Sequence, residues 1–362
     1  FKTSFPAIQV KPGVEYFLNF YASLKNEDGL LKAGTKLADA QVSLPFYQPF
    51  VAEVQSSPVI ADDAASLLTL TAGNLSVGFD KETGALISYK EGSTELIKEA
   101  LRPNFWRPVT DNDMGNGMNK TLRPWRDAGR QAKLLSMKQK ALGKEVYEVV
   151  SHYKLPVGES DFIVTYHFSG KGYLDVNCTF IPGNDTLPLL PRMGVSITLN
   201  RQFSQMEWLG RGPHENYIDR NTSSYVGLYK GSVADQYFPY DRPQENGNKT
   251  EVRWMSLTDT AGQGLMVVGQ PYVSTSAYLF PTEDLDEPGL RKSQRHLSDI
   301  QFKDMVTWNI DLKQMGVGGD TSWGAYPHQP YLIPAERMSF SFRFCPAKQN
   351  GVSGNRQYLN FK

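Results

Sequence analysis

The 362-residue sequence contains little of what several common protein classes require. Its two cysteines, Cys178 and Cys345, lie far apart and form no C-x-x-C pattern, so we expect neither a disulfide framework nor a cysteine zinc site. Two buried free thiols are expected instead, and they leave the cellular compartment open. Basic and acidic residues number 38 each, so there is no charge excess to favour nucleic-acid binding.

Long apolar runs and helical periodicity are also nearly absent. No apolar run approaches the roughly 18–20 residues of a membrane-spanning helix, so we predict no membrane span. Phosphate-binding loops, nucleophile elbows, HExxH motifs and dinucleotide fingerprints are missing, which removes the enzyme classes built on them. The best helix candidate is short, at residues 123–130.

What dominates instead is the alternation of apolar and polar residues that half-buried strands show, clearest over residues 338–344. Three hairpins are predicted in this way, with their strands at 75–79 and 85–89, 161–168 and 173–180, and 251–257 and 264–268. Many short strands separated by glycine-rich turns predict an all-β fold.

One domain boundary stands out. Residues 58–66 are mostly small or polar and show no periodicity, so we interpret them as a linker. Residues 1–57 contain three strand-like runs, at 7–10, 15–24 and 40–44, whereas an immunoglobulin-like sandwich needs about seven strands. We therefore expect a partial sandwich before the linker and one large β-domain over residues 67–362.

Four segments are dense in polar and aromatic residues: 105–117, 208–220, 237–248 and 316–324. In the first, Asp111 and Asp113 resemble the start of an EF-hand calcium loop. The sixth and twelfth positions of that loop would be Asn116 and Leu122 rather than Gly and Glu, so no calcium site is predicted. The aspartates would instead cap backbone N–H groups of an irregular loop, which its glycines would also allow to act as a lid.

Taken alone, the second and third segments nominate Glu215 and Glu245 as a catalytic pair, with His214 assisting, because glycoside hydrolysis uses two carboxyl groups. The alternative is that arginines of the same segments pair with these carboxylates and hold long loops in place. Those arginines are Arg211, Arg220 and Arg242. In the fourth segment, Trp323 follows a glycine-rich turn that carries Asp320, which suits a sugar platform or a core-capping tryptophan equally well.

The stretches FWRPVTDNDMG, WLGRGPHENYIDR, DQYFPYDRPQENGNKTEVRW and GVGGDTSWG occur in this order. Together they resemble the C-terminal region of the large bacterial β-galactosidases of glycoside hydrolase family two. The resemblance covers the whole chain and departs from the family pattern at Pro108, Val109 and Thr321. It implies that residues 67–362 form a β-supersandwich related to galactose mutarotases, and that residues 1–57 are the end of an immunoglobulin-like domain.

The resemblance also implies where the chemistry lies. In that family the catalytic glutamates belong to an upstream TIM barrel, and this chain lacks the strand–helix alternation of a barrel, so we expect no catalytic residue here. The family's magnesium and sodium are bound mainly by upstream domains, so we expect no metal or other cofactor in this segment. The residues carried over as substrate-binding are Trp323, Asp320, Asn112 and Gly115, which would form one wall of a galactoside pocket.

The parent enzyme would hydrolyse terminal β-D-galactosides, such as lactose or a plant or host glycan, with retention of configuration. Its partners would be the rest of its own chain and, in a homo-oligomer, further copies. One alternative is a stand-alone aldose epimerase, for which His214 and Glu215 are the adjacent His–carboxylate pair in the sequence. The other is a non-catalytic carbohydrate-binding module.

Overall fold

The computed structural model describes residues 7–51, 55–286, 295–321, 324–348 and 358. The chain divides into two compact units, residues 1–53 and residues 54–362. Within the described ranges, no helix has both the length and the apolar character needed to cross a membrane.

The first unit contains an antiparallel pair of strands, β1 (Tyr16–Ser23) and β2 (Lys36–Leu44). The run at 7–10, predicted as a strand, has no regular secondary structure, so that prediction is wrong. Two strands cannot bury both of their faces, and Phe20 and Tyr21 remain about half exposed. The assignment of this unit to a partial immunoglobulin-like sandwich stays a prediction.

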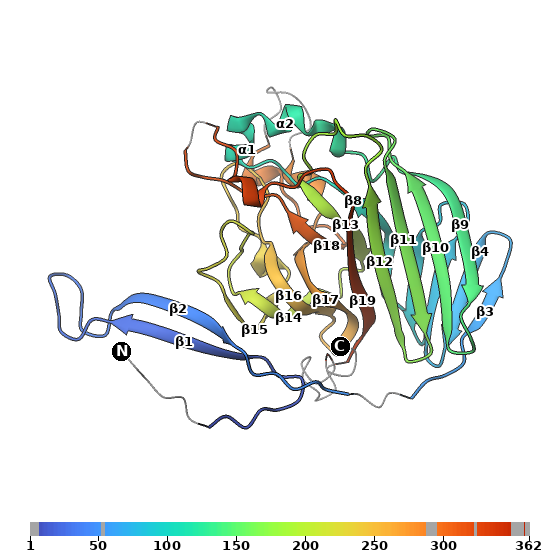
Figure 1. The fold of residues 1–362 in the computed structure, drawn as a ribbon, viewed down its shortest axis with the longest axis horizontal. Coiled ribbons are helices and arrows are strands. Elements are labelled where there is room, and N and C mark those ends of the chain that lie inside the picture. Colours follow the sequence, from blue (N-terminus) through green and yellow to red (C-terminus); the bar gives the residue numbers. More distant parts are fainter. Residues whose placement is uncertain (1–6, 52–54, 287–294, 322–323, 349–357, 359–362) are drawn as a thin grey trace. The chain divides into compact units, whose positions relative to one another are not determined.

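The second unit is built around a large antiparallel sheet (Figure 1). Its main path runs through β15 (Tyr225–Ser232), β14 (Gln205–Gly212), β16 (Lys249–Thr258), β17 (Gln263–Tyr278), β19 (Met338–Lys348), β12 (Tyr173–Ile181), β11 (Asp161–Ser169), β10 (Val146–Lys154) and β9 (Lys133–Ala141). A branch consists of β18 (Val306–Gln314), β13 (Arg192–Leu199) and β8 (Ile97–Asn104). The branch leaves from β17, which pairs with β19 through residues 263–270 and with β18 through residues 274–278.

A smaller sheet contains β3 (Ile60–Asp63), β4 (Leu67–Ala72), β5 (Leu75–Asp80), β6 (Leu86–Glu91) and β7 (Thr94–Glu95). Alternate side chains of β4 and of β11 are buried, as the period-two pattern requires. These buried faces share one hydrophobic core, in which the Phe79 and Tyr166 rings meet at 4.9 Å between centroids. Because the sheets cover each other in this way, the all-β supersandwich is confirmed.

All three predicted hairpins are present, as β5–β6, β11–β12 and β16–β17. Cys178 and Cys345 are buried free thiols, as expected. At residues 58–66 the structure differs from the predicted linker, because this segment contains strand β3. The strand pairs with β4, although its side chains are exposed. An exposed edge strand needs no apolar alternation, because backbone hydrogen bonds alone hold it to the sheet.

The predicted helix at 123–130 is wrong. Only a 3₁₀ turn forms there, η1 (Arg123–Trp125), because the chain must then pass close to β8. A Cβ on Gly129 would lie 1.9 Å from the carbonyl oxygen of Pro103, so this contact requires glycine. Two short α-helices of the described residues are α1 (Asp111–Asn116) and α2 (Met118–Thr121), which lie beyond the end of the branch in Figure 1. Further 3₁₀ turns are η2 (Ala234–Gln236), η3 (Thr282–Leu285), η4 (Leu297–Asp299) and η5 (Gln329–Tyr331).

Candidate functional site

Helix α1 begins at a capping box rather than as an irregular loop. The Asp113 N–H donates to Thr110 Oγ1 at 3.2 Å, and the Thr110 N–H donates to Asp113 Oδ2 at 2.9 Å. Gly117 ends the helix in the left-handed conformation at φ 80°, which favours glycine. The prediction that an aspartate caps backbone N–H groups is therefore confirmed for Asp113, but the segment it caps is a helix.

The buried Arg107 guanidinium joins α1 to the glycine-rich segment. Its Nη2 donates to Asp113 Oδ1 at 3.0 Å and to the carbonyl oxygen of Gly316 at 2.9 Å. The two ionic side chains are 0% and 1% exposed. A buried ion pair with additional hydrogen bonds is sensitive to loss of either partner, because the remaining charge is left without compensation.

Two predicted wall residues lie on α1 and contact the glycine-rich segment directly. Asn112 Nδ2 donates to the carbonyl oxygen of Val317 at 3.0 Å. Gly115 lies so close to Gly324 that a Cβ on Gly324 would be 2.4 Å from the Gly115 oxygen. The structure therefore brings Asn112 and Gly115 against the same segment that carries Asp320.

Asp320 is 62% exposed and forms an ion pair with His328 Nε2. Trp323, the fourth predicted wall residue, lies outside the described residues. The exposed Asp320 carboxylate lies on one side of a polar surface next to α1. Neighbours of Asp320 in the same segment contact that helix.

The remaining two polar segments complete the same arrangement. Arg242 Nε binds Asp111 Oδ1 at 2.6 Å, and Gln244 Nε2 donates to Asp111 Oδ2 at 3.1 Å. From the second segment, Asp219 Oδ2 accepts from the Gly318 N–H at 2.8 Å. All four segments that the sequence singled out are thus joined by hydrogen bonds around α1.

Glu215 is occupied by structural contacts. Its carboxylate accepts from Tyr240 Oη at 2.6 Å, from the Gly247 N–H at 2.7 Å and from Arg220 Nη2 at 3.1 Å. The pairing with Arg220 follows the prediction that arginines hold these loops. For the other two arginines that prediction is wrong, since Arg211 pairs with Glu251 and Arg242 with Asp111.

Glu245 lies in a buried ionic group that the sequence did not indicate. Arg192 Nη2 is 3.4 Å from Glu245 Oε2, and Arg192 Nε is 3.4 Å from Asp311 Oδ2. Burial raises the pKa of Glu245, and it raises the pKa of Asp311 to about 7, with the Arg192 charge opposing both shifts. Arg192 and Asp311 stand alone on their strands without a motif, so no sequence signal could have identified them. Glu215 and Glu245 are each held by neighbouring polar side chains, and the expectation that neither is catalytic stays a prediction.

His214 and Glu215 are adjacent in the sequence, but their side chains form hydrogen bonds to other residues and not to each other. His214 Nε2 is 2.9 Å from Ser224 Oγ, whereas the Glu215 carboxylate is directed to the partners named above. In the described part of the chain, no three His, Cys, Asp or Glu side chains group as a metal site would require. The carboxylates of Asp113 and Asp111 are paired with Arg107 and Arg242.

Replacing the buried arginine should destabilise the second unit. We expect Arg107→Gln to lower the free energy of unfolding by about 3–5 kcal/mol, because Asp113 would remain buried without a counter-charge. Urea denaturation followed by near-UV circular dichroism measures this. Lys98→Gln is the control: it breaks an exposed pair with Asp304 and should cost no more than about 1 kcal/mol. Equal effects of the two substitutions would contradict a structural role for Arg107.

The His328–Asp320 pair should titrate together. The hydrogen bond to Asp320, and then its charge, raise the pKa of His328 above the usual value of about 6.5. The contribution of this pair to stability is therefore fully present below that usual value and is lost as the pH rises through the raised pKa. In proton NMR titrations, Asp320→Asn should lower the pKa of His328 and Asp304→Asn should leave it unchanged. A His328 pKa that does not respond to Asp320→Asn would show that the two side chains are apart in solution.

Comparison with known proteins shows which family the chain belongs to. A family model described as "Beta galactosidase small chain" matches residues 71–344. A β-galactosidase of Priestia megaterium is 36% identical over 326 residues, which are 89% of this chain and 31% of the relative. A β-galactosidase of Lactobacillus delbrueckii subsp. bulgaricus is 33% identical over 327 residues, or 87% of this chain and 30% of the relative.

The chain thus spans about a third of the length of the curated relatives it matches. A solved galactose 1-epimerase of Lactobacillus acidophilus is similar with a TM-score of 0.42 and 9% identity, over 82% of this chain and 99% of that one. A likeness at this level carries no functional argument. The sequence similarity, in contrast, shows the family: the chain belongs to the family of the β-galactosidase small chain.

Proposed function

We propose that this chain is a segment of a β-galactosidase and that it supplies one wall of the galactoside pocket. The names of its relatives and its match to about a third of their length support this reading. The catalytic carboxylates would belong to the part of the enzyme that this chain does not match. Magnesium and sodium, where the enzyme uses them, would also be bound there.

The observation that carries the proposal is the contact between α1 and the glycine-rich segment. Asn112 reaches Val317, and Gly115 meets Gly324, so the predicted wall residues lie on two segments that hold each other in place. Asp320 remains largely exposed beside them and can accept hydrogen bonds from sugar hydroxyls. In contrast, Glu215 and Glu245 are bound by neighbouring side chains and are not available to a substrate.

In this proposal the chain contributes binding rather than proton transfer. The reaction would proceed with retention through a covalent galactosyl-enzyme formed on an upstream carboxylate. Trp323 would stack against the apolar face of the galactose ring, and Asp320 would orient a hydroxyl. Closing the pocket on this side would also exclude water from the reacting bond.

The test uses the full enzyme and this chain in parallel. The isolated chain should not cleave a chromogenic β-galactoside. In the full enzyme, Trp323→Ala should raise KM about tenfold with a smaller change in kcat, because stacking that is equal in the ground and transition states affects binding alone. Steady-state kinetics over a range of galactoside concentrations measures both constants.

Tyr272→Ala is the matched control, since Tyr272 is an exposed aromatic residue on β17 that is not part of the wall. It should leave KM unchanged. An unchanged KM for Trp323→Ala would favour a core-capping role for this tryptophan. Glutamate-dependent turnover by the isolated chain would overturn the assignment of the catalytic residues to another part of the enzyme.

A further inference from the structure

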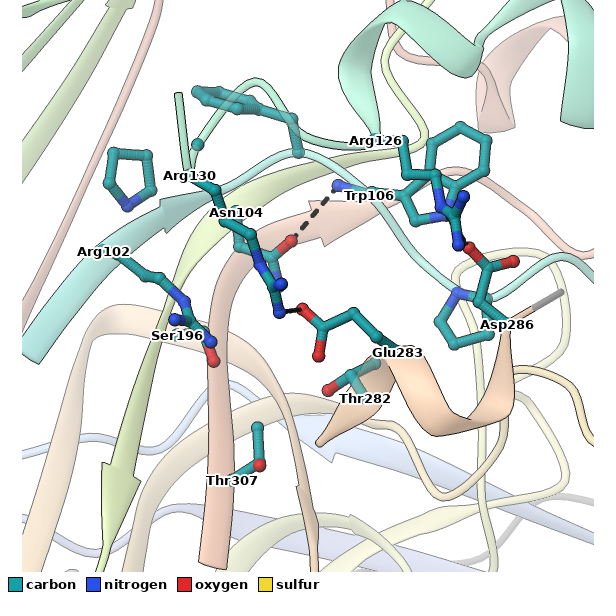
Figure 2. A pocket seen from close by; sticks show the side chains of 14 residues that line it. Arg102, Asn104, Trp106, Arg126, Arg130, Ser196, Thr282, Glu283, Asp286 and Thr307 are labelled. Atoms are coloured by element: carbon teal, nitrogen blue, oxygen red, sulfur yellow. Dashed lines mark hydrogen bonds and ion pairs between the residues drawn. The ribbon is translucent and has the colours of Figure 1, made fainter. Parts of the chain in front are cut away.

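The hollow on the branch of the large sheet is too small to bind a sugar (Figure 2). Its volume is about 30 Å³, which is room for roughly two water molecules. Two ion pairs line it, Arg126 with Asp286 and Arg130 with Glu283, and they tie the chain after η1 to η3 and the residue that follows it. This hollow therefore offers no alternative to the wall as the place where a galactoside binds.

The glycine-rich segment of the wall is held by hydrogen bonds to its backbone groups. The Gly316 N–H donates to the carbonyl oxygen of Tyr331 at 2.9 Å, and the Gly316 carbonyl accepts from Arg107. Two residues further on, the Gly318 N–H donates to Asp219 Oδ2 at 2.8 Å. The contact with Asp219 thus lies nearer to the exposed end of the segment than the contact with Arg107.

The backbone that follows this contact is intrinsically free to turn. Gly318 has φ 68° and Gly319 has φ 122°, both in the left-handed region that favours glycine. Asp320 comes directly after them and its side chain is 62% exposed. The direction of the Asp320 carboxylate therefore depends on how the chain is held just before the two glycines.

Asp219 is presented to the segment by a tight turn with a fixed base. Tyr217 and Arg220 exchange two backbone hydrogen bonds across the turn, at 3.2 and 2.8 Å. Tyr217 is 2% exposed, and Arg220 is paired with Glu215. A buried ring and an ion pair therefore anchor the loop that carries Asp219.

The Asp219 carboxylate packs directly on the glycine-rich segment. A Cβ on Gly316 would lie 2.6 Å from Asp219 Oδ2, which is the same atom that accepts from the Gly318 N–H. The other carboxylate oxygen, Oδ1, is buried and has no hydrogen bond to a described residue. The hydrogen bonding of this side chain is thus directed to the glycine-rich segment rather than to its own loop.

We propose that Asp219 is a positioning residue for the galactoside wall: by holding the Gly318 N–H, it sets the direction in which Asp320 faces the substrate. The proposal rests on the function proposed above, in which Asp320 orients a sugar hydroxyl. Asp219 itself does not touch the substrate. Without its hydrogen bond the two glycines would be free to turn, and Asp320 would have to be ordered when the sugar binds, which costs affinity.

Steady-state kinetics of the full enzyme tests the role of Asp219. Asp219→Ala should raise KM about fivefold, the equivalent of one net hydrogen bond, with little change in kcat. Asp219→Asn keeps a side-chain oxygen as acceptor and should have a KM near that of the parent. Because Asp219 acts through Asp320, Asp219→Ala combined with Asp320→Ala should have about the KM of Asp320→Ala alone.

Hydrogen exchange followed by mass spectrometry tests the contact itself, independently of the reaction. In the full enzyme, peptides covering residues 316–320 should exchange roughly fivefold faster in Asp219→Ala, because the Gly318 N–H loses its acceptor. The same peptides should exchange at the parent rate in Asp219→Asn.

Asp259→Ala is the matched control. Asp259 also accepts from backbone N–H groups, those of Ala261 and Gln263, but it lies in the turn between β16 and β17. Its substitution should change neither KM nor the exchange of residues 316–320.

Unchanged exchange in Asp219→Ala would overturn the proposal, and so would an unchanged KM in this variant when Asp320→Ala raises KM. Independent, multiplying effects of the two substitutions would also overturn it, because Asp219 would then not act through Asp320. An unchanged KM in Asp320→Ala would instead refute the function of the wall. Faster exchange in Asp219→Ala would then show that the contact with Gly318 exists but serves no galactoside.

Discussion

The buried guanidinium of Arg107 is the contact on which the arrangement around α1 depends. It neutralises Asp113, the residue that also closes the helix cap, and it binds the Gly316 carbonyl of a segment about two hundred positions away in the chain. A neutral side chain in its place would leave the charge of the buried aspartate without compensation. The helix start and the glycine-rich segment are therefore fixed relative to each other by one ionic group.

The Arg107 contact follows directly on the branch of the large sheet. Strand β17 pairs with β19 along one part and with β18 along another, so β18, β13 and β8 diverge from the main path. The chain leaves β8 at Asn104, and Arg107 soon after it is directed to the α1 contact.

Much of the fold follows from local sequence, and the reasons are visible in particular elements. The hairpin β11–β12 alternates buried and half-buried side chains, which is the pattern that a sheet covered on one face imposes. Strand β3 was missed because an exposed edge strand carries no such pattern. Helix α1 was missed although Thr110 and Asp113 have capping-box spacing, since six residues are too few for helical periodicity.

For the site, the sequence by itself indicated four segments in which polar and aromatic residues are dense, and the structure joins these segments by hydrogen bonds around α1. Through the family resemblance it also predicts Trp323, Asp320, Asn112 and Gly115 as wall residues, which stays a prediction. Only the tertiary structure decided how these segments meet and that Glu245 is paired with Arg192. Those outcomes depend on strands distant in sequence becoming neighbours, and burial and pairing of charges exist only once that has happened.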